Sequence, residues 1–375
     1  MKLSDFDYEL PKELVAQEAL DDRSRARMMV LQEAGGFLHR QIGDLTDCLG
    51  DGDVLVFNNT RVLPARLKGR KSSGGKVDAL VLNNAMGAGT TIVAGATAEP
   101  GAQVATELAA NSALREVLLR GSNILEGSTI TFDSIVSDTE KIQTEVLRAE
   151  VLRAKVLRRL RGAHYLLEFD RPEWIERVGE MPIPPYIKTK LVDQERYQTV
   201  YSKEKGSLAA PTAGLHFTAE LLEKLRAKGV RFAFVTLHVG IGTFETIRSA
   251  TVEDWKMHQE FCSVSEENAA VINAAIVEKR RIFPVGTTSV RTLESVIENA
   301  RVRAIEKWTD IFIYPGYQFK CAYAGLLTNF HLPESTLLLL VCALAGKDKI
   351  FAAYAEAVRS GYRFYSLGDA MLILL

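Results

Sequence analysis

The sequence is short of several features that often identify a function class. Its 375 residues include only four cysteines, Cys48, Cys262, Cys321 and Cys342, and none of them has the CxxC spacing of zinc or redox sites. The N-terminus carries no signal pattern, and the longest apolar stretch, 337–345, is far shorter than the roughly 20 residues of a membrane span. We therefore expect unpaired cysteines, no membrane contact and a cytoplasmic location.

Two further absences narrow the possible functions. The net charge is only −1, so positive charge as a whole does not indicate nucleic-acid binding, and any RNA contact must depend on local patches. The motifs GxxxxGK(S/T), HExxH and GxSxG are missing. Gly240 and Gly242 do not begin a dinucleotide-binding motif, because Glu245 stands at the place of its third glycine.

The most informative stretch present is 208–244, which contains His216 and His238. Between the histidines the pattern predicts a helix capped by Thr218. The apolar run 231–239 then predicts a strand buried on both faces, with His238 as its last side chain. Ligands of open α/β sheets bind just beyond the carboxyl ends of strands, so we expect chemistry at this point.

Polar residues also follow three other predicted strands. Strand 54–57 is followed by an Asn-Asn-Thr-Arg run, and strand 281–285 by a Thr/Ser-rich start of a helix whose apolar stripe extends to Ala304. A third strand is predicted at 310–314. A turn or a helix cap accounts for each group of polar residues by itself. Several such groups at the strand ends of one sheet instead favour a functional site.

Residues 62–168 predict a small all-β, barrel-like domain inserted into an α/β (mixed α+β) domain made of 1–61 and 169–375. Within the insert, 85–113 is an Ala/Gly-rich, low-complexity segment. The near-repeat EVLRA-EVLRA-KVLRR at 145–159 has a five-residue period that suits neither helix nor strand. We interpret it as a duplication that lengthens a hairpin, with arginines that either meet phosphates or stay solvated.

Several segments together carry a resemblance to one known family. They are APTAGLHFT (210–218), TLHVGIGTF (236–244), VGTTSVRTLES (285–295), TDIFIYPGY (309–317), LLTNFHLPEST (326–336) and GYRFYSLGDAMLI (361–373). These segments resemble those of the S-adenosylmethionine:tRNA ribosyltransferase-isomerases of queuosine biosynthesis. Ala19 stands where that family usually has proline, and 83–161 departs from its shorter barrel module.

The resemblance implies a ribosyl transfer. The ribosyl part of S-adenosylmethionine is moved to the aminomethyl group of 7-aminomethyl-7-deazaguanine at the tRNA wobble position, which gives epoxyqueuosine, adenine and methionine. S-adenosylmethionine is then a consumed substrate, and neither a tightly bound cofactor nor a metal is expected. The expected partners are tRNA and S-adenosylmethionine, bound by a monomer.

The resemblance also implies roles for residues at the strand ends. We expect His216 and His238, and then His331, to act as acid or base, with Asp310 holding a histidine tautomer or the substrate amine. The remaining candidates would bind substrate: Thr287, Thr288 and Arg291 the methionine carboxylate or ribose, Asn59, Arg61 and Arg66 the tRNA or its modified base, and Thr212, Gly240, Gly242, Tyr314 and Asn329 the reacting groups.

Two other function classes stay open on the residues alone. A metal-dependent hydrolase would use His216, His238, His258 and His331 as ligands, although they lack HxH or HxxxH spacing. A non-catalytic tRNA-binding protein would need only the basic loops. Turnover with modified tRNA distinguishes both from the transferase.

Overall fold

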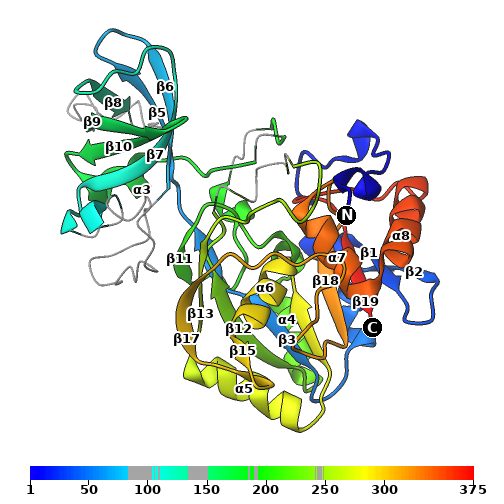
Figure 1. Cartoon of the computed structure of the whole chain (residues 1–375). Coiled ribbons are helices and arrows are strands. Elements are labelled where there is room, and N and C mark those ends of the chain that lie inside the picture. The colour runs from blue at the N-terminus through cyan, green and yellow to red at the C-terminus, as the bar shows by residue number, and fades with distance from the viewer. Residues whose placement is uncertain are drawn as a thin grey trace. The chain divides into compact units, whose positions relative to one another are not determined.

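The computed structural model describes residues 1–82, 104, 106–108, 110–133, 151–184, 186–189, 193–240, 242, 247 and 249–375. The chain forms two compact units, coloured along the sequence in Figure 1. The first, here the sheet unit, comprises Met1–Arg61, Pro184–Glu204 and Ala209–Leu375, and the second, the barrel unit, comprises Val62–Ile183 and Lys205–Leu208.

The sheet unit is built on a nine-stranded sheet in the order β17-β13-β12-β3-β14-β18-β19-β1-β2. Its centre is parallel, because β3 pairs in parallel with both β12 and β14, and β14 pairs in parallel with β18. The strands are β1 (Arg27–Leu31), β2 (Phe37–Gln41), β3 (Val54–Asn58), β12 (Arg231–Leu237), β13 (Glu260–Val264), β14 (Ile282–Val285), β17 (Ile305–Thr309), β18 (Gly325–Asn329) and β19 (Ala370–Leu374).

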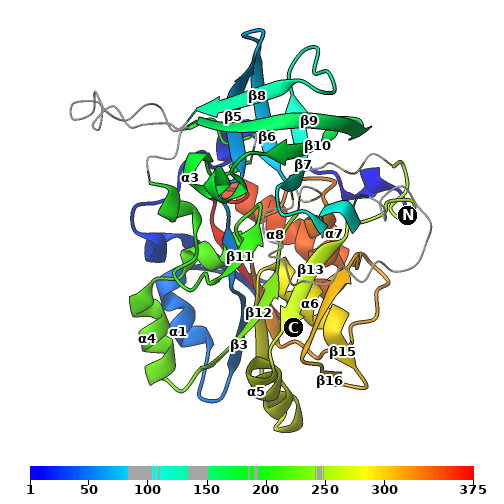
Figure 2. The same ribbon diagram turned by 90° about the vertical axis from the view of Figure 1, so that its left-hand side faces the viewer.

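The central strand β3 is buried on both faces, as its unbroken apolar run predicts. Val54 and Val56 pack into one hydrophobic cluster, together with Val290 of α6. Leu55 and Phe57 point the other way, into the cluster that holds the apolar face of α4. The period-2 alternation thus gives the sheet two cores, and Figure 2 shows α4 and α6 on opposite sides of β3.

Threonine and serine side chains cap the first turns of helices in this unit. Thr218 Oγ1 accepts a hydrogen bond from Leu221 N at 3.2 Å, and Ser335 Oγ accepts one from Leu338 N at 3.2 Å. The helices of this unit are α1 (Leu45–Cys48), α4 (Ala219–Ala227), α5 (Glu266–Val277), α6 (Thr287–Val296), α7 (Thr336–Ala345) and α8 (Lys347–Arg359), and its short 3-10 turns are η1 (Leu3–Phe6), η2 (Lys12–Leu14), η3 (Arg23–Arg25), η4 (Ile42–Asp44), η6 (Gln194–Tyr197) and η7 (Thr212–His216).

Two sequence predictions in this unit are wrong. Helix α6 does not reach Ala304 but ends at Val296, because Asn299 and Ala300 turn the chain with φ of 50° and 57°. The turn joins β15 (Ile297–Glu298) to β16 (Arg301–Val302). The strand predicted at 310–314 lies earlier, as β17.

The barrel unit is a closed six-stranded barrel in the order β10-β7-β6-β5-β8-β9, which confirms the fold predicted for the insert. It extends past residue 168, since Glu180 and Arg66 exchange backbone hydrogen bonds of 2.7 and 3.1 Å. Its elements are β5 (Arg66–Lys71), β6 (Lys76–Val81), β7 (Leu114–Arg120), β8 (Thr129–Asp133), β9 (Val151–Arg161), β10 (His164–Phe169), η5 (Pro172–Trp174) and α3 (Ile175–Val178); the chain crosses between the units within β4 (Thr60–Val62) and β11 (Glu204–Ser207).

The described part of the EVLRA repeat lies in strand β9, which pairs antiparallel with β10 as the predicted hairpin, although a five-residue period was expected to suit no strand. In β9, Leu152 and Val156 are both fully buried. A five-residue period moves the Val-Leu pair by one position on a period-2 strand, so the leucine points inward in one copy and the valine in the next. Since both are apolar, the barrel interior tolerates the slip. Residues 145–150, and most of the low-complexity segment 85–113, lie outside the described residues.

All four cysteines are unpaired, as predicted. Three of them, Cys262, Cys321 and Cys342, are buried, and burial raises the pKa of the Cys321 thiol to about 12. In the parts of the chain described above, no helix is long and apolar enough to cross a membrane.

Candidate functional site

The carboxyl ends of the parallel strands gather the predicted polar residues at one edge of the sheet. Strands β3, β12, β14 and β18 run in the same direction, so the residues after Asn58, Leu237, Val285 and Asn329 meet there. Strand β17 also points this way, because both it and β12 pair antiparallel with β13. Asp310 therefore reaches the same edge, but its side chain is exposed.

A pocket, here the strand-end pocket, lies at this edge. Gly286 and Tyr365 line it, together with apolar side chains such as Leu337. The tyrosine has a positive φ of 74°, which is unusual outside glycine. The candidates from the sequence that line this pocket are Thr212, Thr287, Thr288, Arg291, Asn329 and His331.

Arg291 is the main charged group of the strand-end pocket. Its side chain is 6% exposed and forms an ion pair with Glu260, which is 2% exposed. Its Nε also donates to Ile311 O at 3.4 Å. Arg291 Nη2 and Thr288 Oγ1 are both buried without a hydrogen-bond partner in the described part of the chain. Buried polar atoms are normally satisfied, so this pair indicates a place for an acceptor-bearing ligand.

Glu260 was missed by sequence reasoning. Its Oε1 accepts a hydrogen bond from Gly240 N at 2.9 Å while its Oε2 contacts Arg291. It therefore ties the turn after His238 to the guanidinium. The only sequence signal was an acidic residue at the start of an otherwise apolar strand, FCSV, which reads equally well as a solvated strand end.

His216 ends the turn η7 and is buried. Asn329 Nδ2 lies 3.2 Å from its Nε2 and also donates to Asp369 O at 3.4 Å. A carbonyl oxygen only accepts, so the amide group of Asn329 faces it and donates to His216 as well. The imidazole then accepts at Nε2 and carries its proton on Nδ1. Burial, reinforced by the charges of Arg23 and Arg363, lowers the pKa of His216 to about 4.

His238 follows β12 and has different neighbours. Its ring stacks on Phe261, with centroids 5.6 Å apart, and its Nδ1 lies 2.7 Å from Thr60 Oγ1. The Thr60 hydroxyl donates to Glu204 O at 3.4 Å, so its oxygen accepts from Nδ1–H and Nε2 keeps its lone pair. Burial lowers the pKa of His238 to about 4. The ring does not line the strand-end pocket, although the next residue, Val239, does.

His331 lines the strand-end pocket and is held from several sides. Its Nε2 lies 3.0 Å from Thr328 Oγ1, and its backbone N donates to Tyr354 OH at 2.9 Å. Tyr8 OH donates to its carbonyl oxygen. Burial lowers the pKa of His331 to about 3, so all three candidate histidines are neutral at pH 7.

Comparison with known proteins identifies the family. The family model described as "Queuosine biosynthesis protein" matches residues 3–373. The chain belongs to the queuosine biosynthesis protein family. Curated relatives named S-adenosylmethionine:tRNA ribosyltransferase-isomerase are 48% identical in Symbiobacterium thermophilum and 45% identical in Caldanaerobacter subterraneus, each over the full length of both chains. A crystal structure of S-adenosylmethionine tRNA ribosyltransferase from Thermotoga maritima is 34% identical, with a TM-score of 0.53, and covers 99% of this chain and 100% of that one.

The remaining candidates of this queuosine biosynthesis protein lie around the sheet edge or apart from it. Asn59 Oδ1 accepts from Thr236 Oγ1 at 2.8 Å, and Arg61 contacts Ser202 and Glu195. A Cβ on Gly242 would lie 2.7 Å from His258 Cδ2, so glycine is required there. Tyr314 packs on Phe312, and in the barrel unit Arg66 binds Asp78 through two hydrogen bonds of 2.5 and 3.1 Å.

The candidate histidines do not form a metal centre. Across the described ranges, no group of three or more His, Cys, Asp or Glu side chains is placed to hold a metal ion. Thr60, Asn329 and Thr328 instead occupy one ring nitrogen each of His238, His216 and His331. The structure and the family thus leave the metal-dependent hydrolase and the binding-only protein without support.

Proposed function

We propose that this protein is an S-adenosylmethionine:tRNA ribosyltransferase-isomerase. It transfers the ribosyl group of S-adenosylmethionine to the aminomethyl group of the tRNA wobble base 7-aminomethyl-7-deazaguanine and isomerises it, which gives epoxyqueuosine-tRNA, adenine and methionine. The names of its full-length relatives support this. The structural observation that carries the proposal is the pair of unsatisfied donors, Arg291 Nη2 and Thr288 Oγ1, in the strand-end pocket, which the neutral His331 also lines.

The strand-end pocket suits the methionine part of S-adenosylmethionine. A carboxylate has lone pairs for both Arg291 Nη2 and Thr288 Oγ1, and the N-terminus of the ten-residue helix α6 adds partial positive charge. Glu260 cannot neutralise the whole guanidinium edge, because it already uses its carboxylate on Nη1 and on Gly240 N. A bound carboxylate would therefore satisfy the two donors together.

His238 is our candidate for the base. The reaction needs a group that removes a proton from the carbon next to the sulfonium. Thr60 Oγ1 accepts a hydrogen bond from Nδ1–H of His238, so Nε2 carries a lone pair that no described residue engages, and the lowered pKa keeps the ring in this form at neutral pH.

His216 is our candidate for the group that donates a hydrogen bond to the departing adenine. Its Nε2 is occupied by Asn329, and its proton lies on Nδ1. A neutral imidazole in this tautomer donates a hydrogen bond to a leaving group such as adenine and does not attract the substrate amine's proton. Thr212 keeps Asn329 in place, since its hydroxyl donates to Asn329 Oδ1 at 3.1 Å.

We further propose that S-adenosylmethionine is a consumed substrate with no tightly bound cofactor, and that the protein acts as a monomer in the cytoplasm, where its tRNA substrate is found. His331 and Asp310 remain third-rank candidates, because the first is enclosed by Thr328 and Tyr354 and the second is exposed. Asn59, Arg61 and Arg66 remain proposed contacts for the tRNA or its modified base.

The test follows the two small products. The protein is incubated with S-adenosylmethionine and tRNA that carries the aminomethyl-deazaguanine, and adenine and methionine are quantified. Equal amounts of both, formed only with modified tRNA, are expected. Binding without either product contradicts the proposal, and loss of turnover with a chelator that is restored by added metal favours the hydrolase instead.

A further inference from the structure

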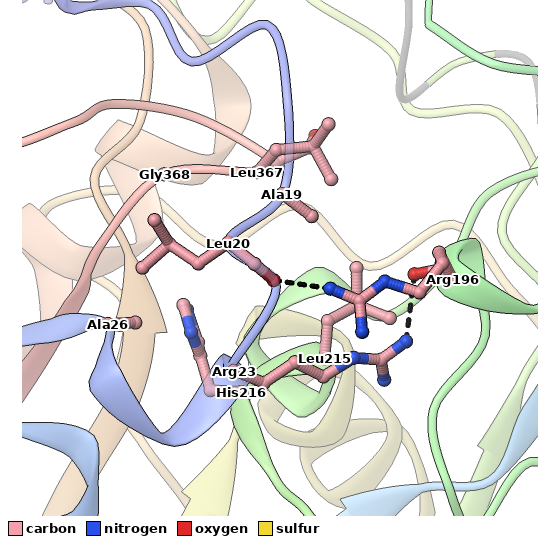
Figure 3. Close-up of a pocket in the computed structure, with 10 residues that line it drawn as sticks. Ala19, Leu20, Arg23, Ala26, Arg196, Leu215, His216, Leu367 and Gly368 are labelled. Carbon is pink, nitrogen blue, oxygen red and sulfur yellow. Dashed lines mark hydrogen bonds between the residues drawn. The ribbon is translucent and has the colours of Figure 1, made fainter. Parts of the chain in front are cut away.

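A second pocket, here the arginine pocket, is lined by His216. Figure 3 shows His216 and the guanidinium groups of Arg23 and Arg196 around it, with Leu20 and Leu367 as apolar walls. Its residues all belong to the sheet unit. Apart from His216, no residue that lines this pocket has a role in the proposed reaction.

Within the described ranges, both guanidinium groups donate to backbone carbonyl oxygens and to no side chain. Arg23 donates to Gln198 O at 2.9 Å and to Arg196 O at 3.0 Å, and Arg196 donates to Leu20 O and, at 3.1 Å, to Asp21 O. In the described part of the chain, neither forms an ion pair. Each guanidinium has five N–H donors, so donors remain for a ligand.

The positive charge of the arginine pocket is only partly compensated. Burial and the neighbouring charge of Arg196 lower the pKa of Arg23, and the carboxylate of Asp193 opposes this only as the smallest cause. Asp193 itself accepts a hydrogen bond from Glu195 N at 2.9 Å, and Glu195 is paired with Arg61. Two partly buried guanidinium groups of like charge therefore lie close together, and neither forms an ion pair with a carboxylate of the described residues.

Arg363 adds a third positive group near this pocket. It lowers the pKa of His216, although burial is the larger cause. Its Nη1 is buried without a hydrogen-bond partner among the described residues, and its Nη2 donates to Glu18 O, close to the pocket-lining Ala19. The carboxylate of Asp369 accepts from its backbone N at 2.8 Å.

We propose that Arg23 and Arg196 bind a backbone phosphate of the tRNA substrate, next to His216. This inference rests on the proposed function. Among the substrates, S-adenosylmethionine carries a single carboxylate, for which Arg291 and Thr288 provide the donors. The remaining anions are the phosphates of the tRNA, and the planar guanidinium fork matches phosphate oxygens. A phosphate held here would place the nucleotide attached to it beside the His216 ring.

The test compares charge removal at two arginines of the sheet unit. Arg196→Gln removes a guanidinium of the arginine pocket, and Arg226→Gln removes one from the exposed surface of α4, where it pairs with Glu223. Binding of modified tRNA is measured between low and moderate salt for both variants. Each phosphate contact contributes about 0.7–0.9 to the slope of log K against log salt, so Arg196→Gln should reduce the slope by about that amount and Arg226→Gln should not.

A conservative variant separates binding from folding. Arg196→Lys keeps the charge, so the salt slope should stay near that of the wild type while tRNA affinity falls through loss of the fork geometry. A structural role alone predicts weaker binding in all variants in proportion to lost thermal stability, with an unchanged slope, and would overturn the inference. A raised KM for S-adenosylmethionine with unchanged tRNA binding would assign the pocket to the small substrate instead. If the wild type releases adenine but Arg196→Gln has a normal slope, only this inference fails; if the wild type neither binds tRNA nor releases adenine, the proposed function fails.

Discussion

His216 and His238 both belong to the sheet unit but differ in what surrounds them. Both are neutral, since burial lowers each pKa to about 4. His216 has an amide donor, Asn329, on Nε2 and guanidinium groups nearby, whereas His238 has a hydroxyl, Thr60, on Nδ1 and an aromatic ring against its face. Burial thus explains why both rings are neutral, and hydrogen bonding decides which ring nitrogen of each can contact the substrate.

The pKa is lowered in both histidines, so it does not distinguish their roles in the reaction. The difference in hydrogen bonding does. A ring with a free Nε2 lone pair removes a proton, and a ring whose Nε2 is already satisfied donates from Nδ1. The hydrogen-bond partners of the two rings, Thr60 and Asn329, therefore select the role of each histidine.

The largest expected effect is the loss of His238. His238→Gln should lower turnover by about 10²–10⁴-fold, because general base catalysis contributes on that scale, and His216→Gln by about 10²-fold. Release of adenine under single-turnover conditions measures both, with thermal unfolding as the control for folding. Unchanged rates in either variant would contradict the corresponding role.

The buried ion pair between Arg291 and Glu260 should contribute to the stability of the fold. Arg291→Met removes the buried guanidinium that compensates the charge of Glu260, so the free energy of unfolding should fall by about 3–5 kcal/mol. Urea unfolding measures the loss. Adding Glu260→Met should restore most of the stability without restoring activity; a double variant as unstable as the single one would show that the ion pair is not the cause.

Acid should destabilise the protein through its neutral histidines. The pKa of His216 is lowered to about 4 and that of His331 to about 3, both below their value of 6.5 in the unfolded chain. Between pH 6.5 and 4 the unfolded chain therefore binds protons that the folded protein does not. Stability should fall with falling pH, by about 1.4 kcal/mol per pH unit for each histidine. His216→Gln should flatten this decline in urea unfolding across that range; an equally steep decline would mean that His216 is protonated in the folded state.

The smallest effect should come from the group that orients His238. Thr60→Val removes the acceptor of Nδ1–H but leaves the ring in place, so turnover should fall by roughly 5–10-fold, the value of about one hydrogen bond. Thr60→Ser keeps the hydroxyl and serves as the matched control. Equal rates for the two variants would show that the tautomer of His238 does not matter.

The sequence predicted the parts of this structure that depend on local pattern. The all-apolar run of β3, the cap Thr218 and the period-2 strands of the barrel unit follow from periodicity and side-chain chemistry. It also located Arg291, Thr288 and Asn329 at strand ends, which the strand-end pocket brings together.

Other features depend on pairing between distant segments, which a single sequence does not display. Glu260 meets Arg291 only because β13 folds back beside β12. His216 was expected beside His238, but η7 turns its ring toward the arginine pocket. The helix predicted to extend to Ala304 ends early, because Asn299 adopts a left-handed turn conformation. The asparagine was a sequence signal for this turn, but the prediction followed the apolar stripe that continues beyond it.

Solvent exchange at the reacting carbon tests the division of roles most directly. Each protein is mixed with S-adenosylmethionine and modified tRNA in D₂O, and deuterium at the ribosyl carbon next to sulfur is measured by mass spectrometry in recovered substrate and product. The His216→Gln variant should still incorporate deuterium although it releases adenine slowly. The His238→Gln variant should neither incorporate deuterium nor release adenine. Deuterium uptake by His238→Gln at the wild-type rate would show that another group removes this proton.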